Sequence, residues 1–493
     1  MEDLRNKFTN GAAWMLAMRF SVNLLAMIST IFLARLLTPE DFGLVALASS
    51  AYIFLSIVGQ LGFDSALIHH PSPSKDHYDS AWTANIAIGL TIAAGMVLVA
   101  KPASSFFEEP RIESIIYVMS ILSLAKGFEN IGVVNFRKNL TFAGDFGYFV
   151  IPKITSVLSA IPAAFILRSY WALVIGMIVG QVSSLIFSHL SQPFRPRFSV
   201  RKTGELLGFS KWILANNLLK YLSENSLDVI LGRMSSTAAV GIFGMGRQIA
   251  FMPTTELMAP INRALFPSLS AISDRKDRLR SAVYKVLGVT VVIALPMAFG
   301  IAAVSDLLVL SFFGEKWGDA APVLEVLALA GVVMVIRGPF WPVLLARGKP
   351  RAQSAVTIVD VCIVVPLSIF LVPSYGPVGV AIAVLTSALL TFPLLFSAVR
   401  REIDLTFRSI VAQIWRPLAA SLVMYLFVKR AQDMQLADGD YGLIELFFCV
   451  FCGTLLYPIG LALLWWTSGR PDSTEFKVLQ KVIAKYRVWR QTS

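Results

Sequence analysis

The chain alternates long hydrophobic runs with short polar segments along almost its whole length. Most of the runs approach or exceed the ~18 apolar residues that mark a membrane-spanning helix. They predict an all-α membrane protein with about 14 transmembrane helices. The predicted spans cover residues 11–34, 42–63, 80–100, 112–135, 146–167, 170–190, 212–232, 237–266, 283–304, 321–345, 353–372, 376–399, 410–428 and 441–467.

A faint internal repeat at an offset of 198 residues indicates that a similar unit is used twice. The pairs that keep this offset are Leu33-Ala34-Arg35 with Leu231-Gly232-Arg233, Gly43 with Gly241, and Ala66-Leu67 with Ala264-Leu265. Many transporters consist of two such repeats with a binding site between them. We therefore predict two pseudo-symmetric six-helix lobes, an extra hairpin and a basic amphipathic tail, which is either bound to the cytoplasmic leaflet or solvated. The expected boundaries are 1–200, 201–400, 401–467 and 468–493.

A second internal similarity relates two dipeptide steps in which a basic residue precedes a glycine, Lys126-Gly127 and Arg337-Gly338. Each step comes shortly before a basic stretch that marks a cytoplasmic exit. Pro339 follows the second step, and a proline there predicts a helix break. We expect Lys126 and Arg337 to be counterparts in the two lobes that face one cavity.

Composition and charge agree with a membrane protein and set its orientation. Only 15% of the 493 residues are charged, against about 25% in a typical soluble domain. With the N-terminus in the cytoplasm, 28 lysines and arginines fall at cytoplasmic ends and loops, and 8 at external ones. Because basic residues concentrate on the cytoplasmic side, both termini are predicted to lie there. The net charge of +12 then reflects membrane anchoring and needs no nucleic acid as a partner.

Sequence motifs for enzymatic chemistry are missing. No phosphate-binding loop of the G-x-x-x-x-G-K-[ST] kind is present, and no connection is long enough for a soluble domain. The pair His69-His70 has no acidic or cysteine cluster beside it, and Cys449-x-x-Cys452 lies in the middle of a predicted span. We therefore predict a protein that is not an enzyme, with no metal site and no cofactor.

Charged residues inside the predicted spans are the strongest sign of function, because one at the bilayer centre costs at least about 2.5 kcal/mol. Cations in a membrane cavity suit an anionic ligand, and arginine matches phosphate geometry best. Lys153 is expected instead to extend to the cytoplasmic surface. The candidates for a cationic cavity that binds a diphosphate are Arg19, Lys126, Lys220, Arg247 and Arg337.

Acidic residues in the same spans leave two interpretations open. Lys126 and Glu129 are spaced i,i+3, and Lys220, Glu224 and Asp228 follow one another at i+4, so ion pairs that lock the bundle are one possibility. The other is coupling of transport to a proton or sodium ion. The carboxylates concerned are Glu129, Glu224, Asp228 and Asp360.

Four stretches of the sequence resemble the polysaccharide transporter family of the multidrug/oligosaccharidyl-lipid/polysaccharide exporter superfamily. The first is Leu33–Leu47, which reads LARLLTPEDFGLVAL and joins the first two predicted spans. The others are Glu224–Asp228 with Leu231–Arg233, Pro260–Ser268 and Leu344–Pro350. The likeness runs over most of residues 8–400 and is weakest after 400.

This resemblance implies two six-helix lobes with pseudo-twofold symmetry, an extra hairpin and a cationic central cavity. It also implies a multi-pass flippase of the bacterial inner membrane that moves undecaprenyl-diphosphate-linked repeat units by alternating access. The branch that serves exopolysaccharides of the succinoglycan, colanic or amylovoran kind is the most similar. The expected partners are the lipid-linked oligosaccharide, the bilayer, and polysaccharide polymerase and co-polymerase proteins.

Two rival functions make different demands on the sequence. A cation-coupled multidrug exporter of the same fold would favour an acidic or aromatic cavity, and the surplus of intramembrane cations argues against it. A membrane glycosyltransferase or polymerase would need catalytic carboxylates on substantial loops, whereas the external loops predicted here are short.

Overall fold

The computed structural model describes residues 2–59, 63–70, 72–139, 141–206, 218–219, 221–252, 254, 268–437 and 442–469. Every regular element in these ranges is helical. Ten of the helices are long and apolar enough to cross a membrane, or up to 11 if one bent pair counts as a single span. The all-helical membrane class is confirmed. The count of 14 stays a prediction, because parts of the spans expected at 212–232 and 237–266 fall outside the described residues.

Contacts between residues divide the chain into two compact units, Met1–Gly241 and Ile242–Ser493. The first unit extends beyond the boundary expected at residue 200, so the limits of the two lobes remain a prediction. Lys220 and residues 470–493 of the tail lie outside the described residues.

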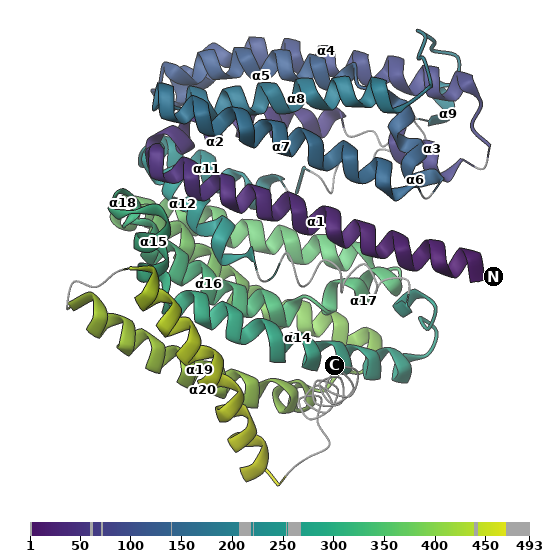
Figure 1. Cartoon of the computed structure of the whole chain (residues 1–493). Coiled ribbons are helices and arrows are strands. Elements are labelled where there is room, and N and C mark those ends of the chain that lie inside the picture. The colour runs from purple at the N-terminus through teal and green to yellow at the C-terminus, as the bar shows by residue number, and fades with distance from the viewer. Residues whose placement is uncertain are drawn as a thin grey trace, which may run out of the picture. The chain divides into compact units, whose positions relative to one another are not determined.

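The first unit consists mainly of long helices, with several short ones between them. Helix α4 packs against α5, α7 against α8, and α1 against α7, and Figure 1 shows α4, α5, α7 and α8 running side by side. Left-handed residues end two of the helices, Glu108 after α4 and Arg168 after α7. The helices are α1 (Glu2–Leu36), α2 (Pro39–Gly59), α3 (Phe63–His69), α4 (Lys75–Phe107), α5 (Arg111–Gly127), η1 (Ile131–Val133), α6 (Val134–Lys138), α7 (Phe142–Leu167), α8 (Trp171–Ser191), α9 (Thr203–Leu206) and α11 (Ser226–Met234), with α12 (Thr237–Ala250) crossing into the second unit.

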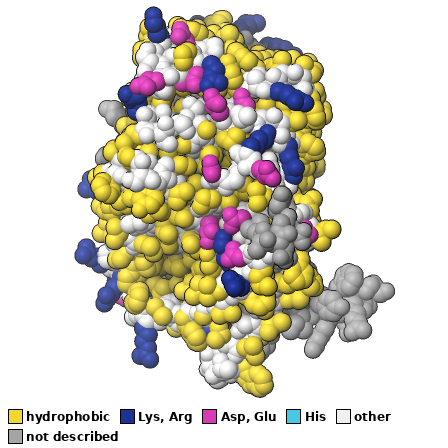
Figure 2. Space-filling view, turned by 90° about the vertical axis from the view of Figure 1, so that its left-hand side faces the viewer, with side chains coloured by type: hydrophobic (Ala, Val, Ile, Leu, Met, Phe, Trp, Pro, Cys, Tyr) yellow, Lys and Arg dark blue, Asp and Glu magenta, His cyan; other side chains and the backbone are white. Residues whose placement is uncertain are grey.

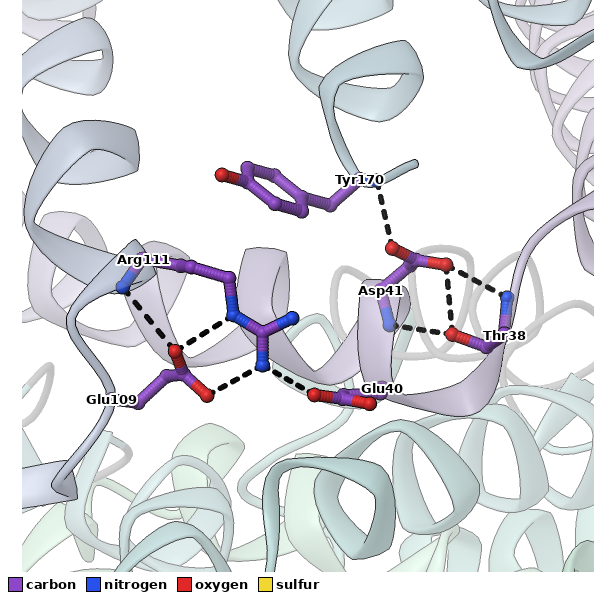
Figure 3. A network of polar contacts seen from close by, with 6 residues as sticks. All are labelled: Thr38, Glu40, Asp41, Glu109, Arg111 and Tyr170. Atoms are coloured by element: carbon purple, nitrogen blue, oxygen red, sulfur yellow. Dashed lines mark hydrogen bonds and ion pairs between the residues drawn. The ribbon is translucent and has the colours of Figure 1, made fainter. Parts of the chain in front are cut away.

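A polar network ties together three turns at one end of the first unit (Figure 3). Asp41, which begins α2, accepts hydrogen bonds from Thr38 and, at 2.8 Å, from the backbone N–H of Tyr170 before α8. Arg111, at the start of α5, donates to Glu109 at 2.8 Å and forms an ion pair with Glu40. The α1–α2, α4–α5 and α7–α8 turns are thereby held by side chains at the end predicted to be external.

The Glu109–Arg111 contact makes a pH-dependent contribution to stability. The hydrogen bond from Arg111 lowers the pKa of Glu109, so the contact stabilises the fold above the ordinary carboxyl pKa of about 4.3 and is lost as the pH falls through the lowered value. We expect Arg111→Gln to cost up to about 1 kcal/mol at neutral pH, since Arg111 is partly exposed. Thermal unfolding of wild type and variant should differ at neutral pH and converge once the pH falls below the lowered pKa of Glu109. The exposed Lys101→Gln serves as the control for loss of one positive charge, and a difference that persists at low pH would contradict the assignment.

Two glycines related by the 198-residue offset meet face to face within the first unit. A Cβ on Gly43 of α2 would lie 1.8 Å from the carbonyl oxygen of Thr237, and a Cβ on Gly241 would lie 1.9 Å from that of Pro39. Thr237 and Pro39 are themselves separated by 198 residues. The contact is therefore reciprocal, as expected for equivalent positions around a twofold axis. This geometry supports the internal repeat.

The second unit has a hydrophobic core to which seven of its helices contribute, from α14 to α20. Fully buried members of this core include Leu287, Leu295, Phe340 and Leu395. Helix α18 contains two predicted spans, because Gly376 breaks it with φ 52° and ψ −133°. The elements are α14 (Lys276–Ala303), α15 (Ser305–Phe313), η3 (Glu315–Trp317), α16 (Ala320–Arg337), α17 (Phe340–Ala346), α18 (Pro350–Ile403), α19 (Phe407–Ala437) and α20 (Leu443–Thr467).

Helices α19 and α20 pack against each other (Figure 1), and the extra hairpin expected at 401–467 stays a prediction. A charged cluster joins α19 to the rest of the unit. Lys429 lies 2.9 Å from both Asp306 at the start of α15 and Glu325 on α16, and Tyr425 donates to Glu325 at 2.6 Å. These contacts hold the carboxylate of Glu325 in a structural cluster within the second unit.

The surface suits a lipid environment. The face in Figure 2 is covered largely by hydrophobic side chains, with charged ones in small groups. Large apolar side chains such as Leu98, Ile166, Phe370 and Ile444 are more than three-quarters exposed. A water-soluble monomer rarely exposes so much contiguous apolar surface.

Candidate functional site

A broken helix lies at the centre of the candidate site in the first unit. Helix α5 ends at Gly127, and the chain turns by 63° into η1 and α6. The close approach of α4 and α5 requires the glycine, since a Cβ on it would lie 2.9 Å from the carbonyl oxygen of Asn85. Backbone groups at the break are satisfied by side chains: Trp82 donates to the carbonyl of Phe128, and Asn130 caps η1. Such breaks line binding cavities in many transporters.

Glu129 occupies this break and is surrounded by donors from three helices. Its Oε2 lies 2.8 Å from Lys126 Nζ and accepts a hydrogen bond from the hydroxyl of Tyr148 on α7. Its Oε1 accepts from the amide of Gln181 on α8 at 2.8 Å. The carboxylate is buried, with a 7% exposed fraction. Of the two interpretations, these contacts favour an ion pair for Lys126 and Glu129.

A cavity of about 390 Å³ opens beside this cluster, within the first unit. Helices α1, α2, α5, α7 and α8 contribute its lining, and Lys126 is part of it. Lys153 also lines the cavity, whereas the sequence placed it toward the cytoplasmic surface. A volume of this size is typical of small-molecule sites. The aromatic side chains that line the cavity are Tyr52, Tyr148 and Phe149.

The second unit contains the other basic–glycine step at the end of a helix. Helix α16 ends at Arg337, and α17 begins after Gly338 and Pro339, as the proline predicted. Arg337 is 7% exposed, and its guanidinium lies over the ring of Trp341 at 5.8 Å from the centroid. Its Nε is buried and has no hydrogen-bond partner among the described residues.

Asp360 is the carboxylate that acts electrostatically on Arg337. Its Oδ1 accepts hydrogen bonds from Ser387 at 2.7 Å and from Thr391 at 3.4 Å, across the kink of α18. These contacts join the two halves of that helix. Ion coupling at Asp360 stays a prediction.

The remaining predicted site residues are spread over both units. Arg19 on α1 has a buried Nη1 with no hydrogen-bond partner among the described residues. Arg247 on α12 lies over the ring of Phe243, at 5.2 Å from the centroid. Asp228 on α11 is buried, whereas Glu224 is exposed. The predicted pairing of Glu224 with Lys220 cannot be followed, since Lys220 lies outside the described residues.

The sequence analysis missed two residues of the site and assigned a third to the wrong place. Tyr148 and Gln181 are uncharged, and nothing in their spacing distinguishes them from ordinary residues of a span. Lys153 carried a usable signal, because it is a cation within a predicted span. The direction of its side chain depends on how α7 packs, which periodicity does not reveal.

The Lys126–Glu129 pair predicts a coupled effect on stability. Lys126→Met should destabilise more than Glu129→Gln, because it leaves a buried carboxylate without its cation. The double variant should lose less unfolding free energy than the two single variants lose together. In a double-mutant cycle measured by unfolding of the purified protein, we expect a coupling energy of about 1–2 kcal/mol. The exposed Asp277–Arg280 pair has the same i,i+3 spacing and serves as the control, with a coupling below about 0.5 kcal/mol. Additive losses at Lys126 and Glu129 would show that the pair is not coupled.

Comparison with known proteins gives a consistent result. Residues 32–322 match the family model described as "Polysaccharide biosynthesis protein". The lipopolysaccharide biosynthesis protein WzxC of Escherichia coli K12 is 22% identical over 428 residues, which cover 85% of this chain and 86% of that protein. The succinoglycan biosynthesis transport protein ExoT of Rhizobium meliloti is 25% identical over 343 residues, 69% of each chain.

Solved structures show the same fold. The lipid II flippase MurJ in an inward closed conformation aligns with a TM-score of 0.75 at 15% identity, covering 93% of this chain and all of that one. An inward-facing multidrug resistance transporter of the MATE family aligns with a TM-score of 0.53 at 14% identity, covering 78% of this chain and 96% of that one. At these identities the likeness establishes the architecture and leaves the substrate to be argued from the residues.

Proposed function

Because the chain belongs to the polysaccharide biosynthesis protein family, we propose that it is a flippase that moves lipid-linked oligosaccharide repeat units across a bacterial inner membrane. The sequence resemblance points to undecaprenyl-diphosphate-linked units destined for an exopolysaccharide. Support comes from relatives named for lipopolysaccharide and succinoglycan biosynthesis, which match most of the chain. The protein then acts as a transporter and catalyses no covalent chemistry.

One observation carries this proposal: each unit holds a buried guanidinium nitrogen without a hydrogen-bond partner among the described residues. These atoms are Nη1 of Arg19 and Nε of Arg337. Buried polar groups are nearly always satisfied, so an unsatisfied one calls for a ligand or water. The phosphate oxygens of a diphosphate accept such hydrogen bonds and supply the opposite charge. Arg247 is a further candidate, while the charge of Lys126 is balanced by Glu129.

The lipid part of the substrate requires an apolar path. The second unit contains an apolar groove of about 560 Å³ between α14, α15, α19 and α20, lined by residues such as Met297, Gly300, Met424 and Gly453. A polyprenyl chain suits such a surface, because burying its apolar surface away from water is favourable and it needs no hydrogen bonds. In this scheme the groove holds the lipid tail and the cations hold the diphosphate.

Transport by such a protein proceeds by alternating access, in which the lobes open in turn to the two sides of the membrane. Binding alone gives no direction, so an ion gradient, the membrane potential or removal of the product must supply it. Glu224, Asp228 and Asp360 are the carboxylates proposed for ion coupling. We also propose that both termini lie in the cytoplasm. The protein is further proposed to associate with polysaccharide polymerase and co-polymerase proteins.

A cation-coupled multidrug exporter is the alternative function on this fold. Its substrates are cations, which the guanidinium groups of Arg19 and Arg337 would repel. The intramembrane charges therefore favour an anionic substrate.

The test combines genetics with reconstitution. Deletion of the gene should cause a lipid-linked oligosaccharide to accumulate on the inner leaflet, and the wild-type gene should restore export. Purified protein in liposomes should move a fluorescent lipid-linked oligosaccharide to the opposite leaflet, where an impermeant quencher detects it. Protein-free liposomes are the control. Normal polymer export in the deletion strain together with transport of cationic dyes by the liposomes would contradict the flippase assignment.

A further inference from the structure

The two lysines of the first-unit cavity differ in their charge balance. Lys126 lies 2.8 Å from Glu129 and 3.4 Å from the hydroxyl of Tyr148. Lys153 lines the same cavity, and no hydrogen bond or ion pair joins it to any residue that the structure describes. Since the charges of Lys126 and Glu129 cancel, the cavity keeps one uncompensated positive charge, on Lys153.

The rest of the lining combines aromatic rings with few free polar groups. Tyr52 and Phe149 come from α2 and α7, and the hydroxyl of Tyr52 makes no hydrogen bond within the described part of the chain. Aromatic rings pack against the apolar C–H faces of sugar rings, and a free hydroxyl can bond a sugar hydroxyl. A largely apolar wall with a few placed polar groups is the usual form of a small-molecule site.

We propose that this cavity binds one acidic sugar of the translocated oligosaccharide, with the sugar carboxylate on Lys153 and the ring against Tyr52 and Phe149. This inference rests on the proposed flippase function and deepens it. It assigns Lys153 the role of selecting repeat units that contain a uronic acid or another carboxylate-bearing sugar.

The charge of the cavity separates this ligand from the alternatives. A diphosphate carries at least two negative charges, and one would remain buried without a partner, which is costly. A neutral sugar would leave the ammonium group of Lys153 without an anion. A single carboxylate balances the single free cation, while the diphosphate is left to the arginines.

The experiment measures the electrostatic potential of the cavity and its occupancy directly. A cysteine is placed at Met177, which lines the cavity, after Cys362, Cys449 and Cys452 are replaced. Reaction rates with an anionic and a cationic thiol reagent are then compared in the purified full-length protein. We expect the anionic reagent to react several-fold faster, Lys153→Gln to bring the ratio close to one, and Lys153→Arg to preserve it. The matched control, Lys126→Gln with Glu129→Gln, changes no net charge and should leave the ratio unaltered.

Ligand protection completes the test. Glucuronate should slow labelling at Met177→Cys more than glucose or inorganic diphosphate at the same concentration, and Lys153→Gln should remove this preference. Equal protection by glucose and glucuronate, or stronger protection by diphosphate, would overturn the inference and leave the flippase function standing. Absence of flipping by wild-type protein in liposomes would instead contradict the proposed function, because the labelling measurement does not depend on transport.

Discussion

Replacing Gly43 or Gly241 by alanine is expected to reduce transport at least tenfold and to lower the stability of the first unit. The new Cβ would lie less than 2 Å from a backbone carbonyl oxygen in either variant, so the helix backbones must separate. Overpacking usually costs about 1–3 kcal/mol, and a backbone neighbour, which cannot change rotamer, places these changes at the upper end. Thermal unfolding of the purified protein and export by complemented cells are the two measurements.

Gly244→Ala is the matched control on α12, since no atom lies within 4 Å of its added Cβ. It should leave export unchanged and stability equal or slightly higher, because alanine favours a helix over glycine by about 1 kcal/mol. If Gly43→Ala kept wild-type stability and export, the close contact of Gly43 and Gly241 would not be needed for either.

Arg337→Ala is expected to abolish polymer export while the protein remains in the membrane at the wild-type level. The guanidinium is buried, and its Nε has no hydrogen-bond partner among the described residues, so its removal strands no donor or acceptor there. Asp360 would keep its bonds from Ser387 and Thr391. Because no hydrogen bond between described residues is lost, we expect stability to stay close to the wild-type value. Arg337→Lys should retain part of the activity, because the charge persists without the bidentate fork.

Arg408→Ala, which removes an exposed cation from the same unit, is the control and should export normally. Export, membrane level and unfolding temperature should be measured together. A variant at 337 that exports normally would refute the binding role. A clear loss of stability would assign Arg337 instead to a structural pair with Asp360.

Local features of the fold followed well from the sequence. Runs of apolar residues predicted the long helices, since a span must satisfy its own backbone hydrogen bonds and cover them with apolar side chains. Helix α16 ends at the Arg337-Gly338 step, as Pro339 indicated, whereas the span predicted over 112–135 is broken after Gly127, which the sequence did not indicate. The equivalence of Lys126 and Arg337 across one cavity remains a prediction.

Partners of the buried charges could not be found in this way. Glu129 is held by Tyr148 and Gln181 from two other helices, and Glu325 by Lys429, which is 104 residues away. Spacing along a helix shows which residues share a face, but not which neighbour that face meets.

The amino-acid order alone specified helices, charge asymmetry and the two glycines of the repeat, because these depend on local geometry and on the cost of burying polar groups in lipid. Packing between helices determined which distant side chains meet. It brought Tyr148 and Gln181 onto Glu129, left Lys153 as the uncompensated cation of the cavity, and brought Gly43 against the backbone of Thr237. Those outcomes depend on the rotation of each helix about its axis, which is set by side-chain contacts between distant segments.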